Sequence, residues 1–382
     1  MNAQEIKRRI RAFEGLFIEH PRVVEAELAV VDLSLRQLDP GSDDHEILCT
    51  STGSEHTFKF DDTHSALEEI ENDLTQYCVL IVGEAGSGKT RLKDQIKARP
   101  EFKQDLSGAD ADIMPLLYFD MPNTPTPKAL LEELCEKAGL VLPKRITRNE
   151  LASKLRTQLA QIGTKLIIID EAHAIVEGRR ERAVVEAARC LKFLLNTCGV
   201  PMVLLGEEPL ARLETSKALK RRIDCHISLD PYSWSYEGDR FEFLNYLDQL
   251  DEALGFQSRC CFADDPDISS RLYLVSGGHI GLVTKYLAKA LKFALREGKN
   301  TIDAGLLAQA YRELHPAKRA IFSDPDMIIA EPAVSQNPFL IDRVAFKKMW
   351  ATKFCQAVSP DTSDVVTKLR GSKKPQNVFQ DG

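Results

Sequence analysis

The chain has 382 residues, which at roughly 150 residues per domain predicts two or three domains and excludes a disulfide-stapled miniprotein. Hydrophobic residues make up 43% and charged residues 28%, and the 21 glycines and 18 prolines are scattered, which excludes a collagen-like or globally disordered chain. The formal charge of -7 gives the whole molecule no attraction for nucleic acid. Any contact with DNA or RNA must therefore come from local basic patches.

The cysteines and the apolar runs bear on where the protein works. The nine cysteines are dispersed and form no CxxC pair, which favours reduced, structural thiols over a metal site. The first residues, MNAQEIKRRIRAFEG, lack the apolar segment of a signal peptide. Apolar runs such as 79–82 are strand-sized and much shorter than the about 18 residues of a membrane helix. We expect a cytoplasmic protein with no membrane partner.

The first 230 residues alternate between strand and helix patterns. Helical periodicity is expected at 3–17, at 23–38 and again from Thr63. Continuous apolar runs, typical of buried parallel strands, occupy 77–82, 116–119, 166–169 and 202–205, and a short strand at 227–229 follows. Helical segments lie between these strands at 127–138, 148–162 and 181–197. The alternation predicts an α/β fold with a parallel sheet covered on both faces.

After Pro231 the pattern is helical only, with segments at 241–254, 267–276, 280–295 and 304–314. The stretch 343–374 carries eight basic residues against two acidic ones, which is typical of a solvated arm, either a docking site or a disordered linker. We therefore expect an N-terminal helical extension (1–60), an α/β core (61–232), an all-helical lid (233–315) and a basic C-terminal tail (316–382).

One motif gives a specific chemical prediction. The segment GEAGSGKT matches GxxxxGK[ST] in full, directly after a predicted strand and at the start of a predicted helix. In such a P-loop the backbone N–H groups surround phosphate oxygens, Lys89 reaches the β- and γ-phosphates, and Thr90 offers a hydroxyl to Mg²⁺. The predicted ATP-binding residues are Gly83, Glu84, Ala85, Gly86, Ser87, Gly88, Lys89 and Thr90.

A second signal is the apolar strand LIIID followed by Glu171. Asp170 would lie at the carboxyl end of its strand beside the P-loop and hold Mg²⁺ through water, while Glu171 would orient and deprotonate the attacking water. A strand followed by a helix with ordinary acidic N-terminal residues is the alternative. His173 is either a partner of Glu171 or a structural histidine.

Basic residues cluster before the last core strand, at Lys217, Lys220, Arg221 and Arg222. In a ring or filament ATPase, an arginine here inserts into the neighbouring subunit's site and stabilises charge on the γ-phosphate. Arg221 is our first choice for this role and Arg222 the second. The alternative is a solvent-exposed basic face.

Together, these features resemble the AAA+ ATPase plan, and more closely the TniB/TnsC family of transposition regulators. The resemblance rests on IVGEAGSGKT (81–90), LIIIDEAHAI (166–175), VPMVLLGEEPLARL (200–213) with the following KRRI, and SGGHIGLVTKYLAKAL (276–291). It implies that ATP-bound subunits assemble as rings or filaments on double-stranded DNA and recruit a transposase. It further implies disassembly on hydrolysis and a TniQ-type targeting partner acting upstream.

Two positions depart from the family pattern. Glu207 stands where a small polar residue is common, and Leu282 stands near the place of a sensor arginine, with Lys285 as the nearest cation. We therefore expect slow hydrolysis. The resemblance also implies that the insert between the two ATPase motifs faces DNA, so we predict non-specific backbone contacts from Lys128, Lys144, Arg145, Thr147 and Arg148. Thr147 with Glu150 also reads as a helix capping box.

Two competing functions stay open at this point. Another DNA-associated AAA+ protein, such as a helicase loader or an initiator, would share the ATP site. A nucleotide-gated scaffold that binds ATP without turnover is compatible with Glu207 and Leu282.

Overall fold

The computed structural model describes residues 3–16, 18, 20–35, 47–51, 54–58, 76–103, 113–122, 125–315, 337–354 and 362–372. The chain forms two compact units, one of residues 21–230 and one that combines residues 1–20 with 231–382. The two N-terminal helices, expected to form one extension, are found in different units. The loop at 40–44, the helix expected from Thr63 and the boundary at residue 60 lie outside the described residues.

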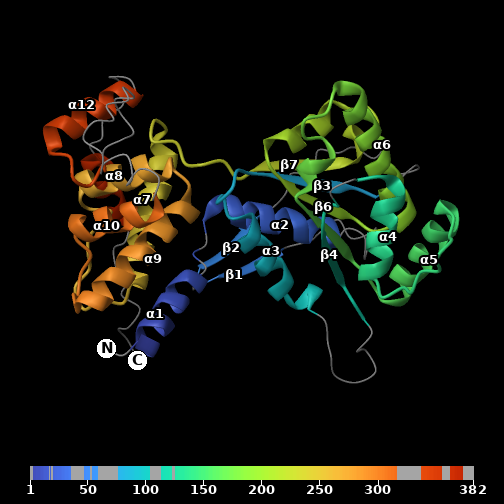
Figure 1. Cartoon of the computed structure of the whole chain (residues 1–382), viewed down its shortest axis with the longest axis horizontal. Helices are drawn as coiled ribbons and strands as arrows, with labels where there is room; N and C mark the ends of the chain where they lie inside the picture. Colours follow the sequence, from blue (N-terminus) through green and yellow to red (C-terminus); the bar gives the residue numbers. More distant parts are fainter. Residues whose placement is uncertain are drawn as a thin grey trace, which may run out of the picture. The chain divides into compact units, whose positions relative to one another are not determined.

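The first unit is built around a five-stranded parallel sheet with the order β4-β5-β6-β3-β7 (Figure 1). Its strands are β3 (Cys78–Val82), β4 (Leu116–Asp120), β5 (Leu166–Asp170), β6 (Met202–Gly206) and β7 (Ile223–Ser228). The four apolar runs are thus confirmed as strands, and the last strand begins four residues earlier than predicted. Strands β3, β5 and β6 are buried along their whole length because helices cover both faces of the sheet.

Helices of this unit divide between the two faces of the sheet (Figure 1). Alternate strand residues such as Leu80, Phe119 and Ile167 share a core with α4 (Pro127–Lys137), α5 (Arg148–Gln161) and α6 (Glu181–Cys198). Helices α2 (Pro21–Leu35) and α3 (Lys89–Ala98) pack against each other, and α2 also contacts β3 and β7. The alternation follows from the period of two in a strand, which sends successive side chains to opposite faces. A separate antiparallel pair, β1 (Ile47–Ser51) and β2 (Ser54–Phe58), was not predicted.

The second unit is entirely helical among its described residues. It contains α1 (Ala3–Gly15), α7 (Glu237–Ala253), α8 (Pro266–Ser276), α9 (Ile280–Glu297), α10 (Ala304–Leu314), α12 (Arg343–Phe354) and α13 (Ser363–Ser372). The four helices expected after Pro231 are therefore confirmed, and α7 begins four residues earlier than expected. Helix α1 packs on α9, and Arg9 donates to the carbonyl of Leu254 at 2.6 Å.

The basic stretch at 343–374 differs from the solvated arm that its composition predicts. Phe346, Trp350, Val365 and Leu369 are buried in the core of the helical unit, and the Trp350 ring lies 5.3 Å from that of Trp234. Composition is misleading here because it reports exposed basic residues such as Lys347, Lys348 and Lys368 and not the buried apolar residues on the same two helices, α12 and α13. Within the described residues, the tail is part of the helical unit.

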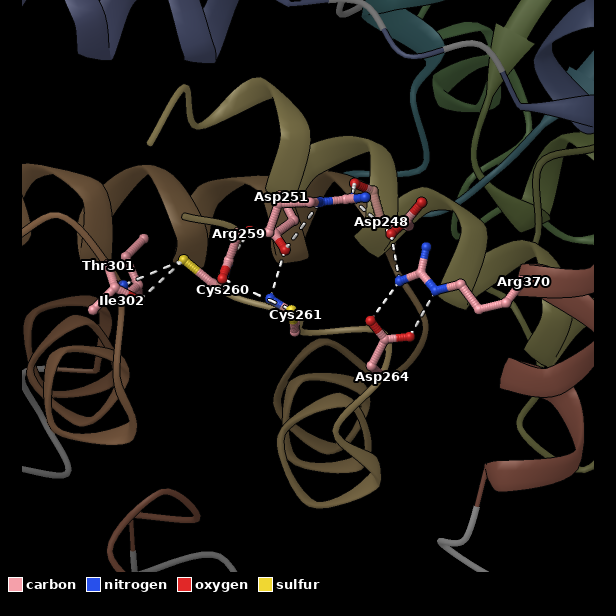
Figure 2. Close-up of polar contacts among 9 residues, drawn as sticks. All are labelled: Asp248, Asp251, Arg259, Cys260, Cys261, Asp264, Thr301, Ile302 and Arg370. Atoms are coloured by element: carbon pink, nitrogen blue, oxygen red, sulfur yellow. Dashed lines mark hydrogen bonds and ion pairs between the residues drawn. The ribbon is translucent and has the colours of Figure 1, made fainter. Parts of the chain in front are cut away.

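Charged contacts hold α13 in place (Figure 2). Arg370 donates to both carboxylate oxygens of Asp264 at 2.8 and 2.6 Å, and its guanidinium lies 2.9 Å from Asp248. Arg259 donates to the same buried Asp248 carboxylate at 2.6 Å. Two arginines from different segments therefore neutralise one carboxylate, which ties α13 to the α7–α8 region.

Candidate functional site

The P-loop connects the end of β3 to the start of α3, at the carboxyl edge of the sheet. The Gly83 N–H donates to the carbonyl of Gly206 at 3.0 Å, which fixes the start of the loop to the neighbouring strand. A Cβ on Gly83 would lie 2.4 Å from Ser87 Oγ, so the turn has room for glycine only. Gly86 and Gly88 have φ of 88° and 105°, a left-handed region that glycine adopts without strain.

The interior of this loop offers donors to an anion. Gly88 is the N-cap of α3 and provides no side-chain cap, so N–H groups of the first turn point toward the loop. The Lys89 ammonium folds back across the loop and donates to the carbonyls of Gly83 at 2.5 Å and Glu84 at 3.0 Å. Ser87 Oγ is buried and has no hydrogen-bond partner among the described residues. These donors fit a polyphosphate.

The acid pair lies at the end of β5, two strands away from β3. Asp170 is 8% exposed, and its Oδ1 accepts the Glu171 N–H at 2.9 Å. Glu171 has a left-handed φ of 51°, and its side chain is 59% exposed. The turn therefore separates the two carboxylates: Asp170 stays within the edge of the sheet, and Glu171 projects into solvent.

His173 connects the acid pair to the end of β6. Its Nδ1 lies 3.4 Å from Glu171 Oε2 and accepts the Glu207 N–H at 3.3 Å. A Cβ on Gly206 would lie 2.9 Å from the His173 backbone nitrogen, so glycine permits this close approach. Glu207 is therefore brought to the same edge as the P-loop and Glu171, as its position after the fourth core strand predicts.

Three polar residues that the sequence analysis did not single out surround Asp170. Lys93 Nζ lies 3.3 Å from Asp170 Oδ2, and the Tyr118 hydroxyl donates to the same oxygen at 3.1 Å and to Asp120 Oδ1 at 2.5 Å. Burial, followed by these carboxylate acceptors, raises the pKa of Tyr118, which therefore remains a protonated donor. The sequence held a signal for Asp120: the strand LLYFD ends in an acidic residue, as the strand LIIID does.

Thr90 and Asp170 supply the oxygen ligands that Mg²⁺ prefers, a hydroxyl and a carboxylate. Thr90 lies in the exposed first turn of α3, and the same helix reaches Asp170 through Lys93. The residues present therefore fit a magnesium ion next to a bound polyphosphate.

The two arginines of the basic cluster before β7 lie in different environments. Arg222 donates to the carbonyl of Gln76 at 3.2 Å within its own chain, whereas Arg221 is exposed. Of these two arginines, Arg221 is therefore the accessible one.

The residues predicted to face DNA fall at the starts of two helices. Lys128 lies in the first turn of α4, 3.5 Å from Glu132. Thr147 is the N-cap of α5 and forms the full capping box with Glu150, as predicted. Lys144 and Arg145 are exposed in the loop before it, and the Arg148 guanidinium lies 5.1 Å from the Phe193 ring centre. The structure therefore gathers Lys144, Arg145, Thr147 and Arg148 at one helix start and places Lys128 at another.

A parallel sheet with a P-loop after β3, an acid pair at the end of β5 and an all-helical second unit define the AAA+ plan. Residues 56–232 match the family model of the bacterial TniB protein. The resemblance to the TniB family is confirmed over this region, which contains the P-loop, the acid pair and Arg221.

Three solved structures to which the chain is similar come from Aeropyrum pernix and Pyrobaculum aerophilum. The Aeropyrum pernix ORC2 protein in ADPNP–ADP complexes is 16% identical with a TM-score of 0.49, covering 81% of this chain and 74% of that chain. The ORC1 protein of the same organism in complex with DNA is 15% identical, with a TM-score of 0.44 and 77% of each chain covered. The Cdc6p protein of Pyrobaculum aerophilum is 14% identical with a TM-score of 0.44, covering 80% of this chain and 83% of that chain.

Comparison with curated protein sequences gives no significant match. Among the described residues, every helix is too short or too polar to cross a membrane.

Proposed function

We propose that this chain is an ATP-dependent, DNA-binding transposition regulator. Its subunits assemble on double-stranded target DNA in the ATP-bound state and recruit a transposase, and slow hydrolysis of ATP takes the assembly apart. The observation that carries the proposal is the P-loop with its inward Lys89 and the Asp170–Glu171 pair on the same sheet edge, within the region that matches the TniB family.

Each residue of the site has its own role in the proposed hydrolysis. Loop N–H groups and Lys89 would hold the β- and γ-phosphates, and Thr90 and Asp170 would hold Mg²⁺. The ion, when bound, offsets the negative charge of the phosphates. Glu171 orients a water molecule and accepts its proton as the oxygen attacks the γ-phosphorus, which releases ADP and inorganic phosphate.

Slow turnover is consistent with the surroundings of Glu171. Its carboxylate lies against His173, which also contacts the Glu207 backbone and the Glu177 carboxylate, so the general base must leave this contact to meet a water molecule. Glu207 also brings a negative charge toward the phosphates. Arg221 of an adjacent subunit would supply the positive charge that this arrangement lacks, so hydrolysis is expected to depend on assembly.

DNA contacts are assigned to the basic helix starts. Lys144, Arg145 and Arg148 are all exposed, and Lys128 and Thr147 belong to the same α4–α5 region. This group would bind backbone phosphate without reading bases, because it adds charge and helix N-termini but no element shaped for a groove. One subunit would bind weakly, and an assembly would bind tightly through many such contacts.

The test is negative-stain electron microscopy of the full chain with double-stranded DNA, in ATPγS and in ADP. Rings or filaments on DNA with ATPγS alone are expected, and Lys89→Ala should abolish them. Monomers under both conditions would overturn the proposal. Assemblies that neither release phosphate from ATP nor bind a transposase would instead favour the nucleotide-gated scaffold, and unwinding or loading of a helicase would favour an initiator.

A further inference from the structure

Asp170, the proposed magnesium ligand, is fully engaged within its own chain. Its Oδ1 accepts the Glu171 N–H at 2.9 Å. Its Oδ2 lies 3.3 Å from Lys93 Nζ and 3.1 Å from the Tyr118 hydroxyl. Side chains of Lys93 and Asp170 are only 13% and 11% exposed, so water screens this ion pair weakly. A cation of the protein thus already pairs with the carboxylate that is proposed to hold Mg²⁺.

The sheet itself creates the need for that cation. Asp120 and Asp170 end two neighbouring parallel strands and are partners in register. Two carboxylates side by side repel each other, and repulsion is relieved by a shared positive charge or a shared proton. Lys93 supplies the charge, and the Tyr118 hydroxyl, which contacts both carboxylates, supplies the hydrogen bond.

Tyr118 is a second partner of the same ammonium. Lys93 Nζ donates to the Tyr118 oxygen at 2.8 Å and lies 4.2 Å from the centre of the ring. The Tyr118 hydroxyl in turn donates to Asp120. A small rotation about the lysine side chain would carry the ammonium from Asp170 toward Tyr118 and Asp120, where it keeps a carboxylate and an aromatic face as partners.

We propose that Lys93 is a resident counter-ion of Asp170 that Mg²⁺ must displace, and that Tyr118 and Asp120 receive its ammonium when it leaves. This inference rests on the proposed function, because it concerns the same nucleotide site. Its consequence is that Lys93 lowers the affinity of the site for Mg²⁺ and makes nucleotide binding without the metal relatively more favourable.

The substitution that isolates this effect is Lys93→Met, which keeps the length of the side chain and removes its charge. Lys97→Met is the matched control: the Lys97 ammonium lies 4.1 Å from the centre of the same Tyr118 ring, and among the described residues it forms no ion pair with Asp170. Lys93→Arg keeps the charge and should behave like the original chain. Tyr118→Phe removes the second hydrogen-bond partner and should strengthen the hold of Lys93 on Asp170.

The measurement is the dissociation constant of ADP for the full chain by isothermal titration calorimetry, in EDTA and over a series of free Mg²⁺ concentrations. The ratio to follow is the dissociation constant in EDTA divided by that in saturating Mg²⁺. Lys93→Met should increase this ratio by about tenfold, because one neighbouring charge changes the affinity of a carboxylate for a cation by about tenfold or more. Lys97→Met and Lys93→Arg should leave the ratio unchanged, and Tyr118→Phe should lower it.

Circular dichroism and thermal melting establish that each variant is folded before titration. An unchanged or smaller ratio in folded Lys93→Met would overturn the inference while leaving nucleotide binding intact. An original chain that binds no ADP, with or without Mg²⁺, would overturn the proposed function and this inference with it. An equal increase for Lys97→Met would also refute it, because the effect would then be one of general surface charge.

Discussion

Glu171 and Gly278 each show how one backbone conformation controls a functional or structural position. The left-handed φ of 51° at Glu171 turns its carboxylate away from Asp170, although the two residues are adjacent in the chain. Gly278, in the SGGH segment, has a φ of 85°. The conformation of Glu171 matters for the proposed chemistry, and that of Gly278 matters for the packing of the helical unit.

For Glu171→Gln we expect retained ATP and DNA binding with phosphate release slowed on the order of 10²-fold or more, because the amide cannot accept the proton of the attacking water. Malachite-green assays of phosphate release, together with the lifetime of assemblies on DNA, would measure this. Undiminished phosphate release would remove Glu171 from the role of general base.

Gly278→Ala should destabilise the helical unit much more than Gly298→Ala. Both glycines have positive φ, but a Cβ on Gly278 would lie 2.1 Å from the Tyr232 carbonyl oxygen, whereas a Cβ on Gly298 meets nothing within 4 Å. We expect about 1–2 kcal/mol of lost stability for Gly298→Ala, from backbone strain alone, and roughly 2–3 kcal/mol more for Gly278→Ala. Urea unfolding of both variants provides the comparison, and equal losses would contradict the role of close packing.

Helix α12 is joined to the lid through a buried arginine. Arg271 on α8 is 3% exposed, donates to the carbonyl of Ile341 at 2.9 Å and also donates to the carbonyl of Pro338. Its guanidinium pairs with both oxygens of Asp267 at 2.9 and 3.0 Å and lies 4.4 Å from the Phe346 ring centre. One side chain therefore joins α8, the turn before α12 and α12 itself.

Arg271→Leu should cost about 3–5 kcal/mol, because it leaves a carboxylate and buried carbonyls without their donor. Arg343→Ala is the control, since Arg343 lies 3.9 Å from the same Asp267 but its side chain is 74% exposed. Loss of that pair should cost less than about 1 kcal/mol. Thermal melting measures both, and hydrogen exchange along 343–354 would show whether α12 detaches.

At the scale of the whole molecule, the proposed function requires an acidic protein to bind an anionic polymer. The net charge of -7 opposes association, so the affinity has to come from a local group of cations at short range and from assembly. The exposed Lys144 and Arg145 before α5 are such a group.

The double variant Lys144→Ala/Arg145→Ala should weaken DNA binding equally for unrelated sequences and reduce the slope of log K against log salt by about two. Fluorescence anisotropy with ATPγS, from low to physiological salt, measures both quantities. Arg182→Ala, an exposed cation on α6, is the control and should leave the slope unchanged. A loss confined to one DNA sequence would indicate base readout instead.

The sequence by itself determined the strands β3 to β6, the P-loop and the acid pair. Strands that are buried on both faces appear as unbroken apolar runs, and phosphate binding requires glycines and a lysine at fixed spacing, so both signals are local. Only the tertiary structure decided that Lys93, Tyr118 and Asp120 gather at Asp170, because this depends on which strands are neighbours and in what register. It also decided that the basic stretch after residue 343 folds onto the lid, since composition reports the charged outer faces of α12 and α13 and not the buried Phe346, Trp350 and Leu369 beneath them.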